Sequence, residues 1–334
     1  MKRIELEPYV TAASSLATTI DLLVRTIRLE GQNILSFELV HPKGELLPEV
    51  EAGAHVDVHL PGGLVRSYSL AGDPADRRRW MLGVLREANG KGGSRAMHER
   101  VRVGGTLRVS WPRNEFKLSH DAKHSILLAG GIGVTPIKSM AHALSHAGKS
   151  FEVHYCARSE ANAAFVEELN ALVGTDRLHW HFDGGDPARG LDIKTLLARP
   201  EAGTHVYFCG PAGFMAACED ASARWDKGTV HREYFKAPVK QVQPGTADGA
   251  FTVFLARSGQ TITVEPDQTI VRAIELSGGR VPTSCMSGLC GTCKVTYLEG
   301  EVDHRDYILS DEEKQYCLTA CVSRARGESL SLDL

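Results

Sequence analysis

Hydrophobic and polar positions alternate along the first third of the chain, which is the pattern of strands with one buried face. The runs at 55–60, 64–70 and 106–111 alternate in this way, and Gly- and Pro-containing turns separate them. No long helical repeat interrupts these strands. Residues from about 20 to 118 are therefore predicted to form an antiparallel β-barrel.

The hydrophobic period changes at about His124. Helix-length segments such as 136–146 and 162–173 now separate short apolar runs, which are predicted as strands at 125–129, 151–156, 178–182, 205–209 and 230–235. Regular alternation of strand and helix is typical of a parallel sheet with helices on both faces. This part is expected to be a doubly wound α/β domain.

A third unit follows a Pro- and Gly-containing segment at 237–249. Strands are predicted at 251–256 and 261–265 and a helix at 269–276, and a second short helix is expected from Ser310, where Ser-Asp-Glu-Glu matches a capping box. The unit is a compact α+β fold. The predicted division is an N-terminal extension (1–20), the barrel (21–121), the α/β domain (122–236), a linker (237–249) and the C-terminal domain (250–334).

Composition narrows the possible partners. The 334 residues carry a net charge of −3, and no half of the chain is strongly basic, which argues against nucleic acid as a ligand. No apolar run approaches the ~20 residues that span a bilayer, and Glu5 and Glu7 interrupt any signal-like start. We expect a cytoplasmic protein with no membrane partner.

Five of the eight cysteines lie in the last fifty residues. Cys285, Cys290 and Cys293 have the spacing C-x4-C-x2-C, and Cys321 follows 28 positions after Cys293. Four thiolates at this plant-type spacing can hold a two-iron cluster. Gly288 and Gly291 suit a loop that wraps closely and directs N–H groups at sulfur.

Several alternatives remain open at this point. The rivals are a zinc site and a group of buried cysteines without a ligand, although the second C-x2-C pair that zinc sites often use is missing. Cys317 competes with Cys321 as the fourth ligand. No cysteine is followed two positions later by histidine, so the chain lacks the ligand pairs of a Rieske centre. Cys156, Cys209 and Cys218 are expected to be buried packing residues.

Two glycine-containing turns are candidate nucleotide loops. The segment Ala-Gly-Gly-Ile-Gly-Val-Thr-Pro at 129–136 joins a strand to a helix, with Thr135 as a possible cap and Pro136 at the helix start. Pro136 occupies the third glycine position of the G-x-G-x-x-G fingerprint. The second turn, Cys-Gly-Pro at 209–211, ends another parallel strand and should lie on the same sheet edge.

The barrel carries two further polar motifs. Arg-Ser-Tyr-Ser at 66–69 lies on a predicted strand, and Gly-Gly-Ser at 92–94 follows a later one. A guanidinium and a glycine-rich turn can hold a phosphate, while an aromatic ring and a hydroxyl can line a flat ring system.

Taken together, these motifs make the chain similar to the phthalate dioxygenase reductase family, which includes vanillate O-demethylase reductases. The likeness covers about residues 20–334 and extends to the segments 112–116, 303–306 and 321–325. It implies a flavin-binding barrel, an NADH-binding domain and a C-terminal β-grasp ferredoxin of the plant type.

The resemblance also implies roles for individual residues. FMN would be bound by Arg66, Ser67, Tyr68, Ser69, Arg86, Gly92, Gly93 and Ser94, with Phe235 beside the flavin. NADH would be bound by Gly131, Gly133, Thr135, Pro136, Arg158, Cys209, Gly210 and Pro211. The [2Fe-2S] ligands would be Cys285, Cys290, Cys293 and Cys321. No catalytic acid or base is assigned.

The expected activity is reduction of a terminal Rieske-type oxygenase that acts on an aromatic acid or a similar small organic substrate. NADH gives up two electrons as a hydride, and a flavin can pass them on singly to the iron–sulfur cluster. The alternatives are a reductase for a cytochrome P450, a general flavin reductase, or a ferredoxin-like carrier with a docking scaffold. FAD and NADPH are alternative cofactors.

Charge distribution bears on the partner. Residues 250–334 hold 12 acidic and 8 basic side chains, a net charge of −4. Acidic residues are concentrated at 299–313, which predicts a transient, salt-sensitive contact with a basic patch on the oxygenase. The reductase itself is expected to be a monomer.

Overall fold

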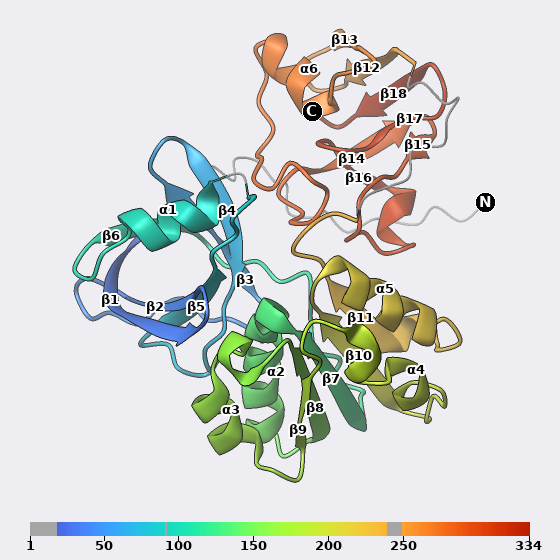
Figure 1. Ribbon diagram of the computed structural model, residues 1–334. Coiled ribbons are helices and arrows are strands. Elements are labelled where there is room, and N and C mark those ends of the chain that lie inside the picture. Colours follow the sequence, from blue (N-terminus) through green and yellow to red (C-terminus); the bar gives the residue numbers. More distant parts are fainter. Residues whose placement is uncertain (1–18, 91, 239–248) are drawn as a thin grey trace.

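The computed structural model of the protein describes residues 19–90, 92–238 and 249–334, in which three large sheets and one two-stranded sheet (β15-β17) form three structural units (Figure 1). Most of the predicted extension (1–20) and most of the predicted linker (237–249) lie outside the described residues. The first strand begins at Thr19, two residues before the predicted start of the barrel.

The first sheet is antiparallel, with strand order β4-β3-β6-β1-β2-β5. An isolated bridge between Leu70 and Leu82 joins the two edges, so that the sheet closes into a barrel. Its inward-facing side chains, such as Val56 and Val58, are fully buried. The strands are β1 (Thr19–Gly31), β2 (Ile34–Val40), β3 (His55–Leu60), β4 (Leu64–Ser69), β5 (Trp80–Leu85) and β6 (Thr106–Ser110).

One helix in the barrel was not predicted from the sequence. Helix α1 (Gly93–Arg100) crosses the space between β5 and β6, and only Gly93, Ala96 and Met97 of its residues are buried. Its sequence, GSRAMHER, has too few apolar positions to show a helical period. Burial of Met97 in the barrel core stabilises the helix in place of an amphipathic pattern.

The second sheet is entirely parallel, with strand order β11-β10-β7-β8-β9. Helix α3 starts at Val166, after a 3-10 turn at Glu160–Asn162, so the helix predicted from residue 162 is shorter than expected. The elements are β7 (His124–Gly130), α2 (Val134–His146), β8 (Ser150–Ala157), α3 (Val166–Val173), β9 (Leu178–Phe182), α4 (Ile193–Leu196), β10 (Thr204–Cys209), α5 (Ala212–Ala221) and β11 (Val230–Glu233).

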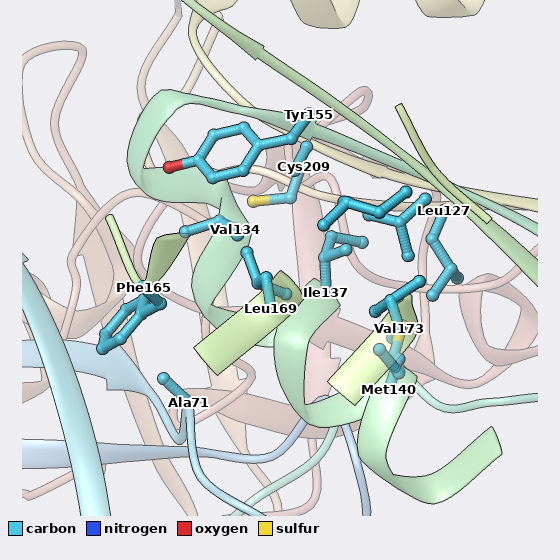
Figure 2. Close-up of a cluster of buried hydrophobic side chains, with 14 of the residues drawn as sticks. Ala71, Leu127, Val134, Ile137, Met140, Tyr155, Phe165, Leu169, Val173 and Cys209 are labelled. Carbon is cyan, nitrogen blue, oxygen red and sulfur yellow. The ribbon is translucent and has the colours of Figure 1, made fainter. Parts of the chain in front are cut away.

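The barrel and the parallel sheet share a hydrophobic core. Ala71 from the barrel side lies in the same buried cluster as Phe165 and the α2 residues Val134 and Ile137 (Figure 2). At Gly83 on β5, a Cβ atom would lie 2.7 Å from the Thr135 side chain, so the two units approach closely. This packing fixes the barrel against the carboxyl edge of the parallel sheet.

The C-terminal unit is a mixed sheet with order β13-β12-β18-β14-β16, covered by α6 (Ile270–Leu276). The predicted capping box at Ser310 forms, because Glu313 N donates to Ser310 Oγ and Ser310 N donates to Glu313 Oε2. Only a 3-10 turn (Glu313–Gln315) follows it. The strands are β12 (Phe251–Leu255), β13 (Gln260–Val264), β14 (Lys294–Glu299), β15 (Val302–Asp303), β16 (Cys317–Thr319), β17 (Arg324–Ala325) and β18 (Ser329–Leu332).

In the described part of the chain, no helix is both long enough and apolar enough to cross a membrane.

Candidate functional site

The N-terminus of α1 forms the phosphate end of the candidate flavin site. Gly92 precedes the helix with φ of 88°, and a Cβ on Gly93 would lie 2.4 Å from Arg66 Cγ, so only glycine lets the arginine pack there. The first turn of α1 has no acidic residue and no side-chain cap. Helix N–H groups beside a guanidinium fit a phosphate monoester such as that of FMN.

Two other predicted flavin residues flank this helix. The Ser94 hydroxyl accepts a hydrogen bond from Glu87 N at 3.0 Å and holds the preceding loop against α1. Arg86 pairs with Glu99 at 2.7 Å, on the same side of the barrel. Both residues lie next to the phosphate end, and both have protein partners in this structure.

Strand β4 provides the ring end of the site. The Ser67 hydroxyl donates to Asp57 Oδ1 at 2.7 Å, and Asp57 is paired with Arg113 at 2.7 Å. Since neighbouring residues on a strand point to opposite faces, Arg66 and Tyr68 share the other face. Ser67 can therefore reach a flavin only through its main chain. Burial raises the pKa of Tyr68, which keeps its phenol neutral.

The two glycine loops meet at the carboxyl edge of the parallel sheet. Strand order reverses between β7 and β10, which is where open α/β sheets bind their ligands. A Cβ on Gly133 would lie 2.1 Å from the carbonyl oxygen of Cys209, and one on Gly210 would lie 3.0 Å from Gly130 Cα. Each loop therefore needs glycine to pack against the other.

The remaining predicted nucleotide residues lie around these loops. Thr135 is buried and donates to Ile132 O at 3.1 Å, and Pro136 lies in the first turn of α2. Gly131 has φ of 53° and open space where a Cβ would be, so a ligand can approach its backbone. Arg158 is exposed directly after β8. This arrangement fits a pyridine dinucleotide laid along the edge.

Phe235 follows β11 and is 39% exposed, which is unusual for a large apolar ring. The sheet order places β11 next to β10 and its loop at 209–211. The ring is thus free to cover a flat cofactor near the junction with the barrel.

The four cysteines proposed as ligands come together in one loop region. The Cys285 thiol contacts that of Cys290, and the Cys293 thiol contacts that of Cys321. Cys290, Cys293 and Cys321 are buried, and all four are free of disulfides. Four converging thiols in one protected pocket fit a [2Fe-2S] cluster.

Cys317 does not join this group. It lies on β16 opposite Thr296 of β14, and its thiol bonds to the Thr296 hydroxyl. The structure therefore places Cys321, and not Cys317, with the other three cysteines. The register of β14 and β16 thus holds Cys317 apart from the group that contains Cys321.

The backbone of the cysteine loop has the tight geometry that a cluster site requires. Met286, Gly288 and Gly291 all have positive φ values, of 51°, 69° and 69°. The Leu289 amide donates to Cys285 Sγ at 3.4 Å. Such amide contacts to sulfur are a feature of iron–sulfur sites.

The cysteine loop packs against the end of the barrel. A Cβ on Gly291 would lie 2.8 Å from Glu115 Oε1. The ring of Tyr307, beyond the loop, lies 5.4 Å from that of Tyr234, and Lys227 pairs with Asp311 at 3.3 Å. The loop therefore faces both the barrel and the parallel sheet, at the point where these two units meet.

Sequence reasoning did not assign a role to Glu233, which lies at this junction. Its Oε2 accepts a hydrogen bond from Ser69 Oγ at 3.0 Å, and its Oε1 lies 4.0 Å from His55 Nδ1. Burial raises the pKa of Glu233 to about 7 and lowers the pKa of His55 to about 4. Because His55 is then neutral, no cation compensates an ionised Glu233. Its place directly before Tyr234 and Phe235, at the end of a strand, was the available signal.

We expect Glu233 to make stability fall as pH rises. An unfolded glutamate ionises near pH 4.3, whereas Glu233 in the folded protein keeps its proton to about pH 7, so the folded state binds the extra proton between these values. The fall should amount to about 2–3 kcal/mol between pH 5 and 8. Unfolding in urea at the two pH values measures it, and Glu233→Gln should remove most of it.

The matched control for this prediction is Glu312→Gln, at an exposed glutamate of the C-terminal unit. The free energy of unfolding of this variant should depend on pH as that of the wild type does. An unchanged pH dependence in Glu233→Gln would contradict the assignment.

Comparisons with known proteins agree with this layout. The model of the 2Fe-2S iron–sulfur cluster binding domain matches residues 253–326, and that of the N-terminal domain of dimethylamine monooxygenase subunit DmmA-like proteins matches 107–229. The first covers all four clustered cysteines.

Full-length relatives match across the three units. A tert-butanol monooxygenase / tert-amyl alcohol desaturase reductase subunit from Aquincola tertiaricarbonis is 48% identical, over 95% of this chain and 96% of its own. A vanillate O-demethylase oxidoreductase from a Pseudomonas strain is 45% identical, over 94% and 100%.

A solved structure gives the same result. Phthalate dioxygenase reductase, described as a modular structure for electron transfer from pyridine nucleotides to [2Fe-2S], is 39% identical with a TM-score of 0.70, over 95% of this chain and 98% of its own. With the flavin, nucleotide and cysteine sites arranged on the same three units, this chain belongs to the phthalate dioxygenase reductase family.

Proposed function

We propose that this protein carries electrons from NADH through FMN and a [2Fe-2S] cluster to a terminal oxygenase of the Rieske type. The observation that carries the proposal is the junction of the three units. There, Ser69 of the barrel bonds to Glu233 of the parallel sheet, and Glu115 at the barrel end touches Gly291 of the cysteine loop. One short region thus borders all three candidate cofactor sites.

When bound, FMN would supply the conversion of a two-electron hydride donor to single electrons, and the iron–sulfur cluster would supply one-electron transfer. The protein supplies placement. The α1 N-terminus and Arg66 would hold the phosphate, and the glycine loops would bring the dinucleotide to the barrel. The Ser69–Glu233 pair holds a proton at the same junction.

The organic substrate would bind to the oxygenase and not to this chain. The vanillate relative favours an aromatic acid or ether, whereas the tert-butanol relative favours a small aliphatic alcohol. We propose a small organic substrate with an aromatic acid as the first choice.

The acidic surface proposed for the oxygenase contact is smaller than the sequence suggests. Asp303 pairs with Arg305, Glu313 with Lys294 and Asp311 with Lys227, and Asp306 caps the amides that follow it. The exposed acids that remain in the segment are Glu299, Glu301 and Glu312. We propose that these three meet basic side chains of the oxygenase in a transient contact.

The test is reconstitution of the purified protein, loaded with FMN and its cluster, with a Rieske oxygenase that acts on an aromatic acid. Product should form at the expense of NADH. Raising the salt from about 0.05 to about 0.5 M should slow transfer to the oxygenase several-fold, because the screening length shortens. Reduction of the protein's own cluster by NADH should not change.

The matched variants separate the docking surface from the cofactor sites. Replacing Glu299, Glu301 and Glu312 together by glutamine should weaken the salt dependence, whereas Glu201→Gln, at an exposed site before β10, should not. If the protein supports turnover by a cytochrome P450 but by none of the Rieske oxygenases tested, the P450 alternative is favoured. Absence of bound FMN and of NADH oxidation would favour a simple carrier.

Two further proposals concern the setting of the protein. All eight cysteines are unpaired, which suits a reducing compartment such as the cytoplasm. All three candidate cofactor sites are built from one chain, so we propose that the monomer is the working unit.

A further inference from the structure

One half of a face of the parallel sheet carries polar side chains in place of a helix. On this face, β7 and β10 pack under α4 and α5 through residues such as Ile126 and Phe208. Strands β8 and β9, side by side at the sheet edge (Figure 1), contribute no residue to that buried cluster. They present instead Glu152, His154, His179 and His181.

Three of these side chains converge on one point. Glu152 Oε2 lies 3.6 Å from His154 Nε2 and 3.7 Å from His179 Nε2. All three ligand atoms lie within 4.8 Å of one another. The two distances are long for hydrogen bonds, but ligand atoms around a tetrahedral Zn²⁺ are about 3.3–3.5 Å apart. Small side-chain movements would therefore complete the coordination.

The state of His154 suits a metal ligand. Its side chain is 8% exposed, and its Nε2 is buried without a hydrogen-bond partner. Its Nδ1 lies 3.1 Å from His181 Nε2. In the tautomer in which His154 Nδ1 donates a hydrogen bond to His181 Nε2, the Nε2 atom of His154 carries its lone pair. The lone pair of His154 Nε2 then faces Glu152, as in metal sites where a second residue orients the ligating imidazole.

The other two ligands are accessible from solvent. The His179 side chain is 40% exposed and that of Glu152 is 29% exposed, so an ion can enter without unfolding. The ring of His179 also stacks on that of His154, with centroids 4.7 Å apart. The pair is therefore already aligned, which reduces the ordering that binding requires.

We propose that Glu152, His154 and His179 form a site for a divalent transition metal ion, with Zn²⁺ as the reference ligand. Two imidazoles and a carboxylate, with open positions for water, are a donor set that Zn²⁺, Ni²⁺ and Cu²⁺ accept. The site lies in the middle of β8 and β9 on one face of the sheet, whereas the glycine loops follow the carboxyl ends of β7 and β10. The ion would bridge β8 and β9 and is separate from the electron-transfer groups.

The test uses the full-length protein with FMN and its cluster in place and any affinity tag removed. Titration calorimetry with ZnCl₂ should give one Zn²⁺ per chain at neutral pH. Glu152→Gln and His179→Asn should each weaken binding at least about tenfold, since each removes one of three ligands. The visible spectrum should show that the cluster stays intact during the titration.

A second histidine pair on the same sheet provides the matched control. His205 Nδ1 and His231 Nε2 are 3.0 Å apart and their rings stack, but among the described residues no carboxylate lies close enough to both rings to complete a group of three ligand atoms. His231→Asn should therefore bind Zn²⁺ as the wild type does. X-ray absorption at the zinc edge should show two imidazoles and oxygen.

Three outcomes overturn the proposal. They are the absence of stoichiometric Zn²⁺ binding by the wild type, a Zn²⁺ affinity of Glu152→Gln and His179→Asn equal to that of the wild type, and sulfur ligands in the zinc-edge spectrum. Sulfur would place the ion at the cluster cysteines. Circular dichroism of each variant shows whether the sheet has folded, so that loss of binding is not confused with loss of structure.

Discussion

Cys321→Ser is expected to abolish electron transfer beyond FMN. The variant loses one of the four thiols that converge in the cysteine loop, and serine is a poor ligand for iron. Iron and labile sulfide per chain should fall to a small fraction of the two of each in the wild type. NADH should still reduce FMN, because the barrel and the glycine loops are untouched. Iron analysis and anaerobic stopped-flow spectroscopy measure the two effects separately.

Cys317→Ser is the matched control, because it removes a buried thiol four positions away. Cys317 bonds to Thr296 across two strands and contacts none of the four clustered cysteines. The variant should keep its iron and its full rate of cluster reduction. Iron loss in Cys317→Ser with retention in Cys321→Ser would reverse the choice of ligand. Loss of flavin reduction in Cys321→Ser would show that the three units do not act as separate modules.

Gly133→Ala is expected to lower kcat/KM for NADH at least about 100-fold, equivalent to about 2.7 kcal/mol of transition-state stabilisation. The added Cβ would lie 2.1 Å from the carbonyl oxygen of Cys209, which is backbone and cannot rotate away. The two glycine loops must therefore separate, and the nicotinamide loses its position relative to the flavin. The rate of anaerobic FMN reduction, measured at several NADH concentrations, gives kcat/KM.

The control for this substitution is Gly213→Ala, in the first turn of α5, where a Cβ meets nothing within 4 Å. It should keep the wild-type kcat/KM. FMN content and the cluster spectrum show whether Gly133→Ala still folds. A folded variant with wild-type NADH kinetics would contradict the close approach of the two loops.

The strands were the part of the fold that the sequence predicted best. The alternating run at 55–60 matches β3 in the structure, and the apolar run at 178–182 matches β9. Nearly all of β3 is buried in the barrel, and β9 contributes Leu178 to the core of the parallel sheet, so the local pattern and the tertiary environment agree. The three fold classes, which rest on these periods, are confirmed by the structure.

Local signals failed where tertiary contacts decide the structure. The capping box at Ser310 forms, yet the chain makes only one 3-10 turn, because Cys317–Thr319 pairs with β14 immediately afterwards. Helix α1 is the opposite case. It forms without a helical pattern in its sequence, because Met97 is buried in the barrel core. In both segments, a partner distant in the sequence outweighs local propensity.

The sequence predicted which residues belong to the candidate site better than it predicted where their side chains point. Spacing alone left Cys317 and Cys321 as rivals; the family resemblance favours Cys321, and the pairing of β14 with β16 holds Cys317 apart from the other cysteines. The motif at 66–69 can be recognised in the sequence. Side chains alternate between the two faces of the strand, however, so the side chain of Ser67 points toward Asp57. Glu233 escaped notice because its raised pKa depends on burial at a junction of units, which no local pattern encodes.

The contact between Gly291 and Glu115 bears on the design of chimeric reductases. The missing side chain at Gly291 and the carboxylate at Glu115 are complementary, although one belongs to the C-terminal unit and the other to the barrel. A ferredoxin unit grafted from a relative with a larger residue at this position could not seat its cysteine loop against this barrel. A chimera that exchanges the ferredoxin unit therefore also needs the matching residue at position 115 of the barrel.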